Sequence, residues 1–486
     1  MSTDAPTRAG RTRKRRSRAF IGTFAVIIAV LGAVGLAGAA ASVAQGPRVT
    51  AVDVDPAAAA AASGSRFIVT TSQSLAEVDA SQVTVTPESS FTVDTSGRSV
   101  GVRFALPLHD DTEYTVVFTG VRGLGGGPPA TITQTFHTPP TEEFLLQRTE
   151  TGDTIFRTDL TGEEAIPVFS DDHIEDFRAT SSHLVVSVRE DDEARLVVTD
   201  LDGTSERALP LPGDGYVTNL QSADRGELIG YTFSDADLDE SGGLESALFT
   251  ASLKQSEADA KPTPVTVTGA EPRVAEWRFV PDTDSILLLT FDGSLLLTGS
   301  GGQDATALGS AIAIEGIARG SSEAIVERGD GPVVIDLSDA SEAPLVAAQD
   351  ELGLRGAVMP VPGGGTVRLG SPVGESGIPT SMTVAYVAED GTTDVLMDVP
   401  SADAVVLQTC VSPSGRYLAV LVAPDAVANP YDRYQLPLPE TLETRVVEIG
   451  ARASKTGVRG GAPEGIASEV VTLSGFDISW CQVPPR

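Results

Sequence analysis

Short alternating runs of apolar and polar residues fill the chain between about residues 48 and 139. Turn-forming residues separate the runs, and their period of two is typical of half-buried β-strands. The runs that show it best are Arg66–Thr70, Gln82–Thr86, Ser99–Phe104, Tyr114–Phe118 and Ile132–Phe136. Strands this short, separated by turns, predict an antiparallel β-sandwich over residues 48–139.

From residue 143 to residue 486 the strands come in repeated pairs. One unit is an apolar run that ends near an aspartate before a polar turn, as in Thr154–Gly162 and Arg195–Gly203. The other is a polar turn before a strongly apolar run, as in Ser285–Leu289 and Arg416–Val420. The pairs recur roughly every 40–50 residues, and an all-strand repeat of that length predicts four-stranded propeller blades.

The two ends of this region each carry only part of a blade. Residues 144–168 hold the later strands, and Phe476–Cys481 is a lone strand. Together they would complete one blade, so the sequence predicts an all-β fold with a seven-bladed β-propeller over 143–486, closed by strands from both chain ends. Cys410 and Cys481 are the only cysteines, and a disulfide between them would fasten the ring. Two buried free thiols are the alternative.

The N-terminus follows a different pattern. Residues 1–18 are strongly basic, and residues 19–44 carry no charged side chain. A helix over 19–44 would be long enough to span a bilayer, and the basic tip would hold the N-terminus in the cytoplasm. The sequence therefore predicts a single-pass transmembrane anchor in the cell membrane, with the bulk of the chain extracytoplasmic. Cleavage of this segment as a signal peptide near Ala44 would make the protein secreted instead.

Both folded regions resemble known families. Leu106–Leu108, Thr112–Val116 and Phe136–Pro139 resemble the bacterial Ig-like domain found in S-layer and other surface proteins, which implies a spacer or adhesive module. Trp277–Asp282 and Ser412–Ala419 resemble the TolB-like or WD40-like bacterial propeller repeat. The second resemblance implies the fold but transfers no functional residue, because propellers host many unrelated activities.

The charge of the chain narrows the classes of partner. Asp and Glu number 67 against 34 Lys and Arg, which gives a formal net charge of −33. So acidic a body repels nucleic acid and anionic lipid, and it suits cationic partners or divalent metal ions. We therefore expect no nucleic acid among its partners.

Alternating carboxylates form the clearest local candidate for a site. Asp235, Asp237, Asp239 and Ser241 have the spacing of the first, third, fifth and seventh positions of a calcium loop. Glu240 stands where such loops usually have glycine, so a solvated acidic hairpin tip is the alternative. No residue pattern indicates a catalytic centre, and calcium is the one cofactor that the sequence suggests.

These features predict a non-enzymatic, membrane-anchored binding or scaffold protein of the bacterial cell envelope, whose propeller face contacts an envelope protein or a glycan. Two alternatives stay open. One is a propeller-type enzyme, such as a glycan hydrolase or lyase, with acidic residues in the central funnel. The other is a sensor of an envelope signal, which would act through a partner because the cytoplasmic tip is only residues 1–18.

Overall fold

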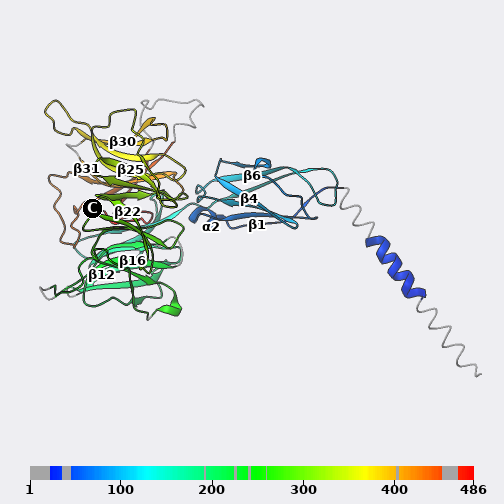
Figure 1. Ribbon diagram of the computed structural model, residues 1–486, viewed down its shortest axis with the longest axis horizontal. Coiled ribbons are helices and arrows are strands. Elements are labelled where there is room, and N and C mark those ends of the chain that lie inside the picture. The colour runs from blue at the N-terminus through cyan, green and yellow to red at the C-terminus, as the bar shows by residue number, and fades with distance from the viewer. Residues whose placement is uncertain are drawn as a thin grey trace, which may run out of the picture. The chain divides into compact units, whose positions relative to one another are not determined.

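Two compact units make up the protein in a computed structural model (Figure 1). The first comprises the chain up to Pro56 together with Ser65–Phe104 and Glu113–His137, and the second comprises Ala57–Gly64, Ala105–Thr112 and everything from Thr138. The structure describes residues 22–35, 45–190, 193–223, 227–238, 242–258, 260–400, 404–450 and 469–485.

The first unit is a β-sandwich of two antiparallel sheets. Buried and exposed side chains alternate along its strands, and the Phe67 and Phe118 rings, one from each sheet, lie 6.4 Å apart between their centroids. One sheet has the order β1 (Val49–Val54), β2 (Arg66–Thr71), β5 (Ser99–Phe104), β4 (Phe91–Ser96), and the other β3 (Val83–Thr86), β6 (Glu113–Val121), β7 (Ala130–His137). A short 3-10 turn, η1 (Ala80–Gln82), precedes β3.

Two segments between strands of the sandwich belong to the second unit. One contains the short helix α2 (Pro56–Ala61) from Ala57 onward, and the other is Ala105–Thr112. The Leu108 N–H donates to the Ala59 carbonyl at 2.8 Å, and Arg416 donates to the Asp110 carbonyl at 2.8 Å. The contact units therefore do not divide at a single point near residue 139.

Seven antiparallel sheets follow one another in the described part of the second unit. In each sheet the strands pair in chain order, as a meander. The sheets are β8 (Glu142–Gln147), β9 (Asp153–Asp159), β10 (Ala165–Asp171); β11 (Ile174–Ala179), β12 (His183–Glu190), β13 (Glu193–Asp200), β14 (Arg207–Leu209); β15 (Gly215–Ser222), β16 (Leu228–Asp235), β17 (Ala247–Ser252), β18 (Thr263–Pro264); β19 (Val274–Phe279), β20 (Ser285–Thr290), β21 (Ser294–Gly299), β22 (Ala305–Ser310); β23 (Ala313–Ile317), β24 (Glu323–Arg328), β25 (Gly331–Asp336), β26 (Glu342–Pro344); β27 (Leu354–Pro360), β28 (Thr366–Ser371), β29 (Ser381–Val387), β30 (Thr393–Pro400); and β31 (Ala404–Val411), β32 (Tyr417–Pro424), β33 (Glu443–Glu448), β34 (Glu469–Ser474). A 3-10 turn, η2 (Gln255–Glu257), lies between β17 and β18.

The first strands of successive sheets contact one another, so they form the innermost layer. These contacts join β11 to β15, β15 to β19, β19 to β23, β23 to β27 and β27 to β31. Apolar side chains fill the spaces between sheets, and one core cluster combines Leu146 of β8, Leu184 of β12 and Leu421 of β32. Sheets that meander outward from a shared inner layer define a β-propeller. The second unit is a β-propeller.

The predicted membrane segment is described only in part. Residues 22–35 form a helix with exposed side chains, and the rest of residues 19–44 lies outside the described residues, as does the basic tip 1–18. Within the described residues, no helix has the length and apolar character needed to cross a membrane.

Candidate functional site

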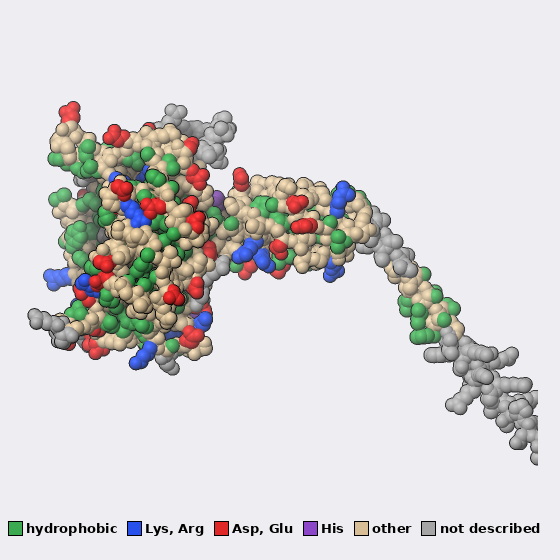
Figure 2. All heavy atoms as spheres, viewed as in Figure 1, with side chains coloured by type: hydrophobic (Ala, Val, Ile, Leu, Met, Phe, Trp, Pro, Cys, Tyr) green, Lys and Arg blue, Asp and Glu red, His purple; other side chains and the backbone are tan. Residues whose placement is uncertain are grey.

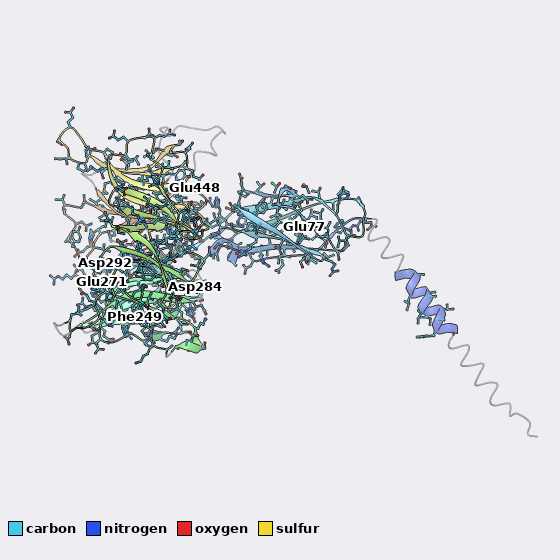
Figure 3. All side chains as sticks on the ribbon, viewed as in Figure 1. Glu77, Phe249, Glu271, Asp284, Asp292 and Glu448 are labelled. Atoms are coloured by element: carbon cyan, nitrogen blue, oxygen red, sulfur yellow. A yellow bond between two sulfur atoms is a disulfide. The ribbon has the colours of Figure 1, made fainter. Side chains whose placement is uncertain are left out.

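The propeller has two ends that differ in the loops they carry. Because neighbouring strands are antiparallel, the hairpins between second and third strands share an end with the links between sheets; we call this the linker end. Hairpins between first and second and between third and fourth strands form the hairpin end. In the sheet β8–β10, Phe476 bridges to β8 on the first-strand side, so the β8–β9 hairpin lies at the linker end, beside the loop between β32 and β33. Figure 3 shows Glu271 and Asp292 of the linker end on one side of the unit, and Asp284 and Glu448 of the hairpin end on the other.

Large apolar side chains are exposed mainly at the linker end. In the described part of the second unit, the other comparably exposed side chains are Ile166 and Val470 on outer strands and Val346, which belongs to a link between sheets but lies beside Gly391 of a hairpin-end turn. The exposed linker-end residues are Leu238, Leu244, Phe291, Ile312, Leu354, Val373, Ile378, Val427 and Tyr431. Figure 2 shows such hydrophobic surface, in green, among acidic side chains in red. Exposed apolar groups gathered at one end of a fold are a candidate interaction surface.

Ion pairs hold the linker-end loops of two neighbouring sheets together. The Arg273 guanidinium contacts Glu271 at 2.6 Å and Glu245 of the preceding sheet at 3.1 Å. It also lies 5.2 Å from the centre of the Phe291 ring, within the range of a cation–π interaction. Phe291 is thus presented to solvent on a braced loop, with 54% of its surface exposed.

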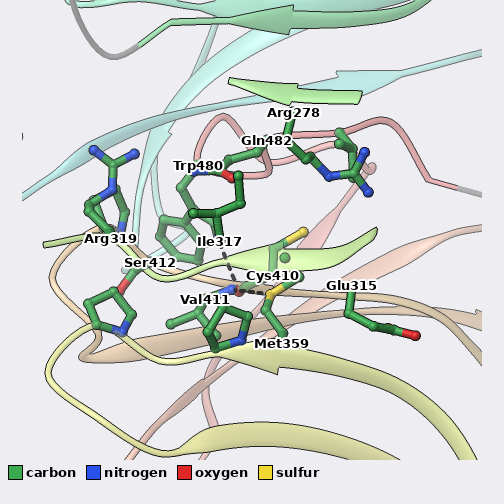
Figure 4. A pocket seen from close by; sticks show the side chains of 15 residues that line it. Arg278, Glu315, Ile317, Arg319, Met359, Cys410, Val411, Ser412, Trp480 and Gln482 are labelled. Carbon is green, nitrogen blue, oxygen red and sulfur yellow. Dashed lines mark hydrogen bonds between the residues drawn. The ribbon is translucent and has the colours of Figure 1, made fainter. Parts of the chain in front are cut away.

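The C-terminal residues run through the centre of the propeller. After pairing beside β8, the chain turns at Trp480, and the amide of Gln408 on the inner strand β31 donates to the Val483 carbonyl at 2.9 Å. Trp480, Gln482 and Val483 line a small pocket of about 60 Å³ near the hairpin end (Figure 4). The central funnel is therefore filled in part by the chain's own tail.

A larger pocket, of about 400 Å³, lies at the linker end of the same channel. Its walls include Glu175, Asp176 and Glu276 from inner strands, Gln435 from the loop between β32 and β33, and Pro484 from the tail. These three carboxylates are the acidic residues that the enzyme alternative would need. Each of them already has a structural partner among the described residues.

Glu276 and Glu315 hold equivalent places on successive inner strands. Glu276 Oε2 accepts from the Ile314 N–H at 2.9 Å, and Glu315 Oε2 accepts from the Val358 N–H at 3.0 Å. Each carboxylate therefore bonds the next inner strand, β23 or β27. Only Glu276 lines the linker-end pocket, whereas Glu315 lines the small pocket near the hairpin end.

A buried ionic triad lies where the tail meets the second sheet. Arg178 contacts Asp176 at 2.9 Å and Asp477 at 2.5 Å, and its side chain is only 3% exposed. Burial raises the pKa of Asp176 well above its ordinary value and also raises that of Asp477, while the Arg178 charge opposes both shifts. The triad joins β11 to residues 476–480, which we call the closing segment, so its position indicates a structural role.

The long loop between β32 and β33 reaches across to the first two sheets. The Tyr434 ring stacks on His173 at 4.0 Å between centroids, and the Arg148 guanidinium lies 3.7 Å from its centre. The Tyr434 hydroxyl donates to Asp153 at 2.6 Å, and Arg148 contacts Asp432 at 2.8 Å. This loop therefore latches the last sheet onto the first two.

The predicted disulfide is present. Cys410 is the next-to-last residue of β31, and Cys481 comes directly after the closing segment. Their Cα atoms are 5.3 Å apart. The Trp480 indole donates to the Cys410 carbonyl at 3.2 Å, beside the bond. Phe476 forms an isolated antiparallel bridge with Leu146 of β8, whereas the strand predicted over Phe476–Cys481 is not formed, because the chain turns at Ser479 and Trp480.

The predicted calcium loop is only partly described. Asp235 accepts a hydrogen bond from the Leu244 N–H at 2.6 Å, whereas Asp239 and Ser241 lie outside the described residues. Asp237 is exposed near the tip of this loop. In the described ranges no group of three or more His, Cys, Asp or Glu side chains is arranged to hold a metal ion. Calcium binding here stays a prediction.

Glu143 gives the ring closure a predicted pH dependence. This β8 carboxylate is buried, and it accepts hydrogen bonds from Ser479 of the closing segment and from Thr141. Burial raises its pKa to about 7, against an ordinary value of 4.5, although both hydrogen bonds oppose the shift. Folding therefore favours the protonated carboxyl. The contribution of Glu143 to the free energy of unfolding is complete below about pH 4.5 and is lost as the pH rises through about 7.

We expect Glu143→Gln to become more stable than the wild type above pH 7. The shift of roughly 2.5 units corresponds to about 3 kcal/mol, which the neutral amide avoids. Urea unfolding of both proteins at pH 5 and pH 8 measures this difference. Glu142→Gln, at an exposed neighbouring carboxylate, is the control and should show no such change. Parallel pH curves for wild type and Glu143→Gln would contradict the expectation.

The comparisons with known proteins concern the fold alone. No protein-family model and no curated relative matches the chain. Similar solved structures include a putative TolB from Agrobacterium tumefaciens, 12% identical over 69% of this chain and 90% of that one with a TM-score of 0.34. The Cps50 (Swd1) β-propeller domain of Myceliophteria thermophila is 12% identical over 62% and 86%, with a TM-score of 0.38.

An oligogalacturonate lyase solved with manganese is 13% identical over 60% of this chain and 90% of that one, with a TM-score of 0.42. Scores this low carry no argument about activity. The propeller assignment rests on the strand order and on the contacts between inner strands.

Proposed function

We propose that this protein is a non-enzymatic, membrane-anchored, extracytoplasmic binding or scaffold protein of the bacterial cell envelope, which binds a macromolecule at the linker end of its propeller. The observation that carries the proposal is the gathering of exposed apolar side chains at that end. Scattered apolar residues are ordinary on protein surfaces, but a bias to one end of a fold favours a binding surface.

The remaining parts of the proposal place this surface outside the membrane. The basic tip and the uncharged segment 19–44 favour an anchor with the N-terminus in the cytoplasm, and cleavage near Ala44 would release a secreted form. The disulfide fits an oxidising compartment outside the cytoplasm. In this proposal the seven sheets are the blades of one closed ring, and the sandwich is an Ig-like spacer.

A propeller-type enzyme is the second candidate, and one observation favours it. The linker-end pocket of about 400 Å³ has the size of a small-ligand site, and it contains Glu175, Asp176 and Glu276. However, Asp176 is paired with Arg178, Glu276 bonds the Ile314 N–H, and Glu175 accepts the Gln435 N–H at 3.0 Å. These contacts support a structural role for the carboxylates, so binding is the better proposal.

The test compares two matched sets of exposed apolar residues. Ile312→Ser with Ile378→Ser removes side chains of the linker end, and Ile166→Ser with Val470→Ser removes exposed side chains of the outer strands β10 and β34. We expect the first pair to reduce capture of envelope proteins or glycans at least tenfold, with unchanged thermal stability, and the second pair to leave capture intact. Equal capture by both variants would overturn the proposal.

A further inference from the structure

We propose that the linker end receives a cationic, amphipathic polypeptide segment of a partner protein. This inference rests on the proposed function and specifies its ligand. It draws on three features of the same end of the propeller: its exposed aliphatic side chains, its excess of acidic side chains, and its pocket.

The exposed apolar groups are mostly aliphatic. Phe291 and Tyr431 are the aromatic members of the set, and the others are leucine, isoleucine and valine. Aliphatic groups leave water most favourably against other apolar side chains, which a polypeptide supplies. Most of them sit at loop tips of sheets three, four, six and seven in chain order, and the surface therefore suits a segment that spans several blades.

Charge selects a basic segment. Five arginines at this end, Arg148, Arg189, Arg273, Arg328 and Arg355, form ion pairs with Asp or Glu, and Arg433 in the loop between β32 and β33 is exposed. Exposed acidic side chains are more numerous: Glu150, Asp172, Glu190, Glu193, Asp214, Asp237, Glu245, Asp292, Asp330, Glu375 and Asp425. This imbalance raises the local concentration of cationic partners and repels anionic lipid, nucleic acid and a second copy of this chain, whose net charge is −33.

The linker-end pocket offers an anchor point within this surface. It combines the carboxylates of Glu175 and Glu276 with apolar walls from Leu436, Pro484 and Pro485. Lysine and arginine have apolar stems and cationic heads, so one such side chain can bury its stem against these walls while its head faces the carboxylates. A basic side chain from the partner would fix the register of the segment over the apolar loops.

The experiment uses a random peptide library displayed on phage. The full chain is held in nanodiscs of zwitterionic lipid, and peptides that bind empty nanodiscs are removed first. We expect the selected peptides to be enriched in Lys or Arg interspersed with aliphatic residues. Synthetic versions should bind at least tenfold more weakly at 300 mM than at 50 mM salt, because attraction between exposed charges is screened.

Two matched variants locate the binding. Glu276→Gln keeps a hydrogen-bond acceptor for the Ile314 N–H but removes the charge from the pocket. We expect it to lower the affinity for the peptides about tenfold. Glu315→Gln makes the same change at the equivalent inner-strand position outside the pocket, and it should leave the dissociation constant unchanged. Ile312→Ser with Ile378→Ser should also weaken binding, whereas Ile166→Ser with Val470→Ser should not.

Failure of this inference can be separated from failure of the proposed function. If the selected peptides are acidic or uncharged but still lose affinity with the Ile312 and Ile378 variant, the linker end is a binding surface and the cationic ligand is wrong. If basic peptides bind but respond equally to Glu276→Gln and Glu315→Gln, the pocket as anchor is wrong. If no selected peptide responds to any linker-end variant, the proposed binding surface fails together with its ligand.

Discussion

Replacing Cys410 and Cys481 together by alanine is expected to lower the free energy of unfolding by about 4 kcal/mol. The disulfide closes a chain segment with a sequence separation of 71, and the entropy lost by an unfolded loop of that length accounts for the value. With roughly 2.1 cal/mol/K of unfolding entropy per residue, summed over the propeller region 143–486, this corresponds to a melting temperature about 6 °C lower. Because both cysteines are replaced, no free thiol is left in the buried site.

Thermal unfolding of wild type and double variant, each with and without reductant, measures this effect. Reduction should bring the wild type to the stability of the variant and should leave the variant unchanged. Trp480 bonds the Cys410 carbonyl, so its fluorescence should respond to opening of the closure, over a background from Trp277, the other tryptophan. If the reduced wild type unfolds at the same temperature as the oxidised protein, the strand pairing and the Tyr434 loop hold the ring without the disulfide.

The strands were predictable because strand formation in this protein follows local patterns. The run Ser285–Leu289 was recognisable as a buried strand from its sequence, and it lies within β20. Repetition of such runs at regular spacing then indicated the propeller, and the partial blades at the two ends indicated that residues near 476 return to β8. The Cys410–Cys481 pairing followed from there being no other cysteine.

The segments that cross between sheets were not predictable. The loop from Asp425 to Leu442 has no periodic pattern, and its contacts with Arg148 and His173 join residues more than 250 positions apart. The path of Gln482–Pro485 along the channel depends in the same way on side chains of distant inner strands. Sequence patterns report a residue's own element, whereas these contacts are set by the assembled fold.

The sequence contains the exposed apolar residues of the linker-end surface, but the strand order is needed to see that they lie at one end. Phe291 stands in a Phe-Asp-Gly turn, and Ile378 stands in a Gly- and Pro-rich connection, where exposed polar residues are more usual. Each alone is an ordinary exposed apolar residue. Only the strand order places both loops at the same end of the propeller.

Substitution of Arg178 by methionine should lower the free energy of unfolding by as much as loss of the Cys410–Cys481 disulfide, or by more. Removing the one cation of the triad leaves the Asp176 and Asp477 carboxyl groups buried together, and breaking a buried ion pair in this way costs roughly 3–5 kcal/mol. Arg157→Met is the matched control, because the Arg157–Glu142 pair is partly exposed and should contribute less than about 1 kcal/mol.

The pH dependence distinguishes loss of charge pairing from loss of packing. Burial already raises the pKa of Asp176 and Asp477 in the folded protein, and without Arg178 both should rise further. Folding of the variant then takes up protons, so its stability should recover as the pH falls below neutrality and decline as the pH rises. Urea unfolding between pH 5 and 8 should therefore show the gap to the wild type widening with pH. Adding Asp176→Asn and Asp477→Asn should close most of that gap at pH 8, and a gap that is constant with pH would mean that Arg178 acts through packing alone.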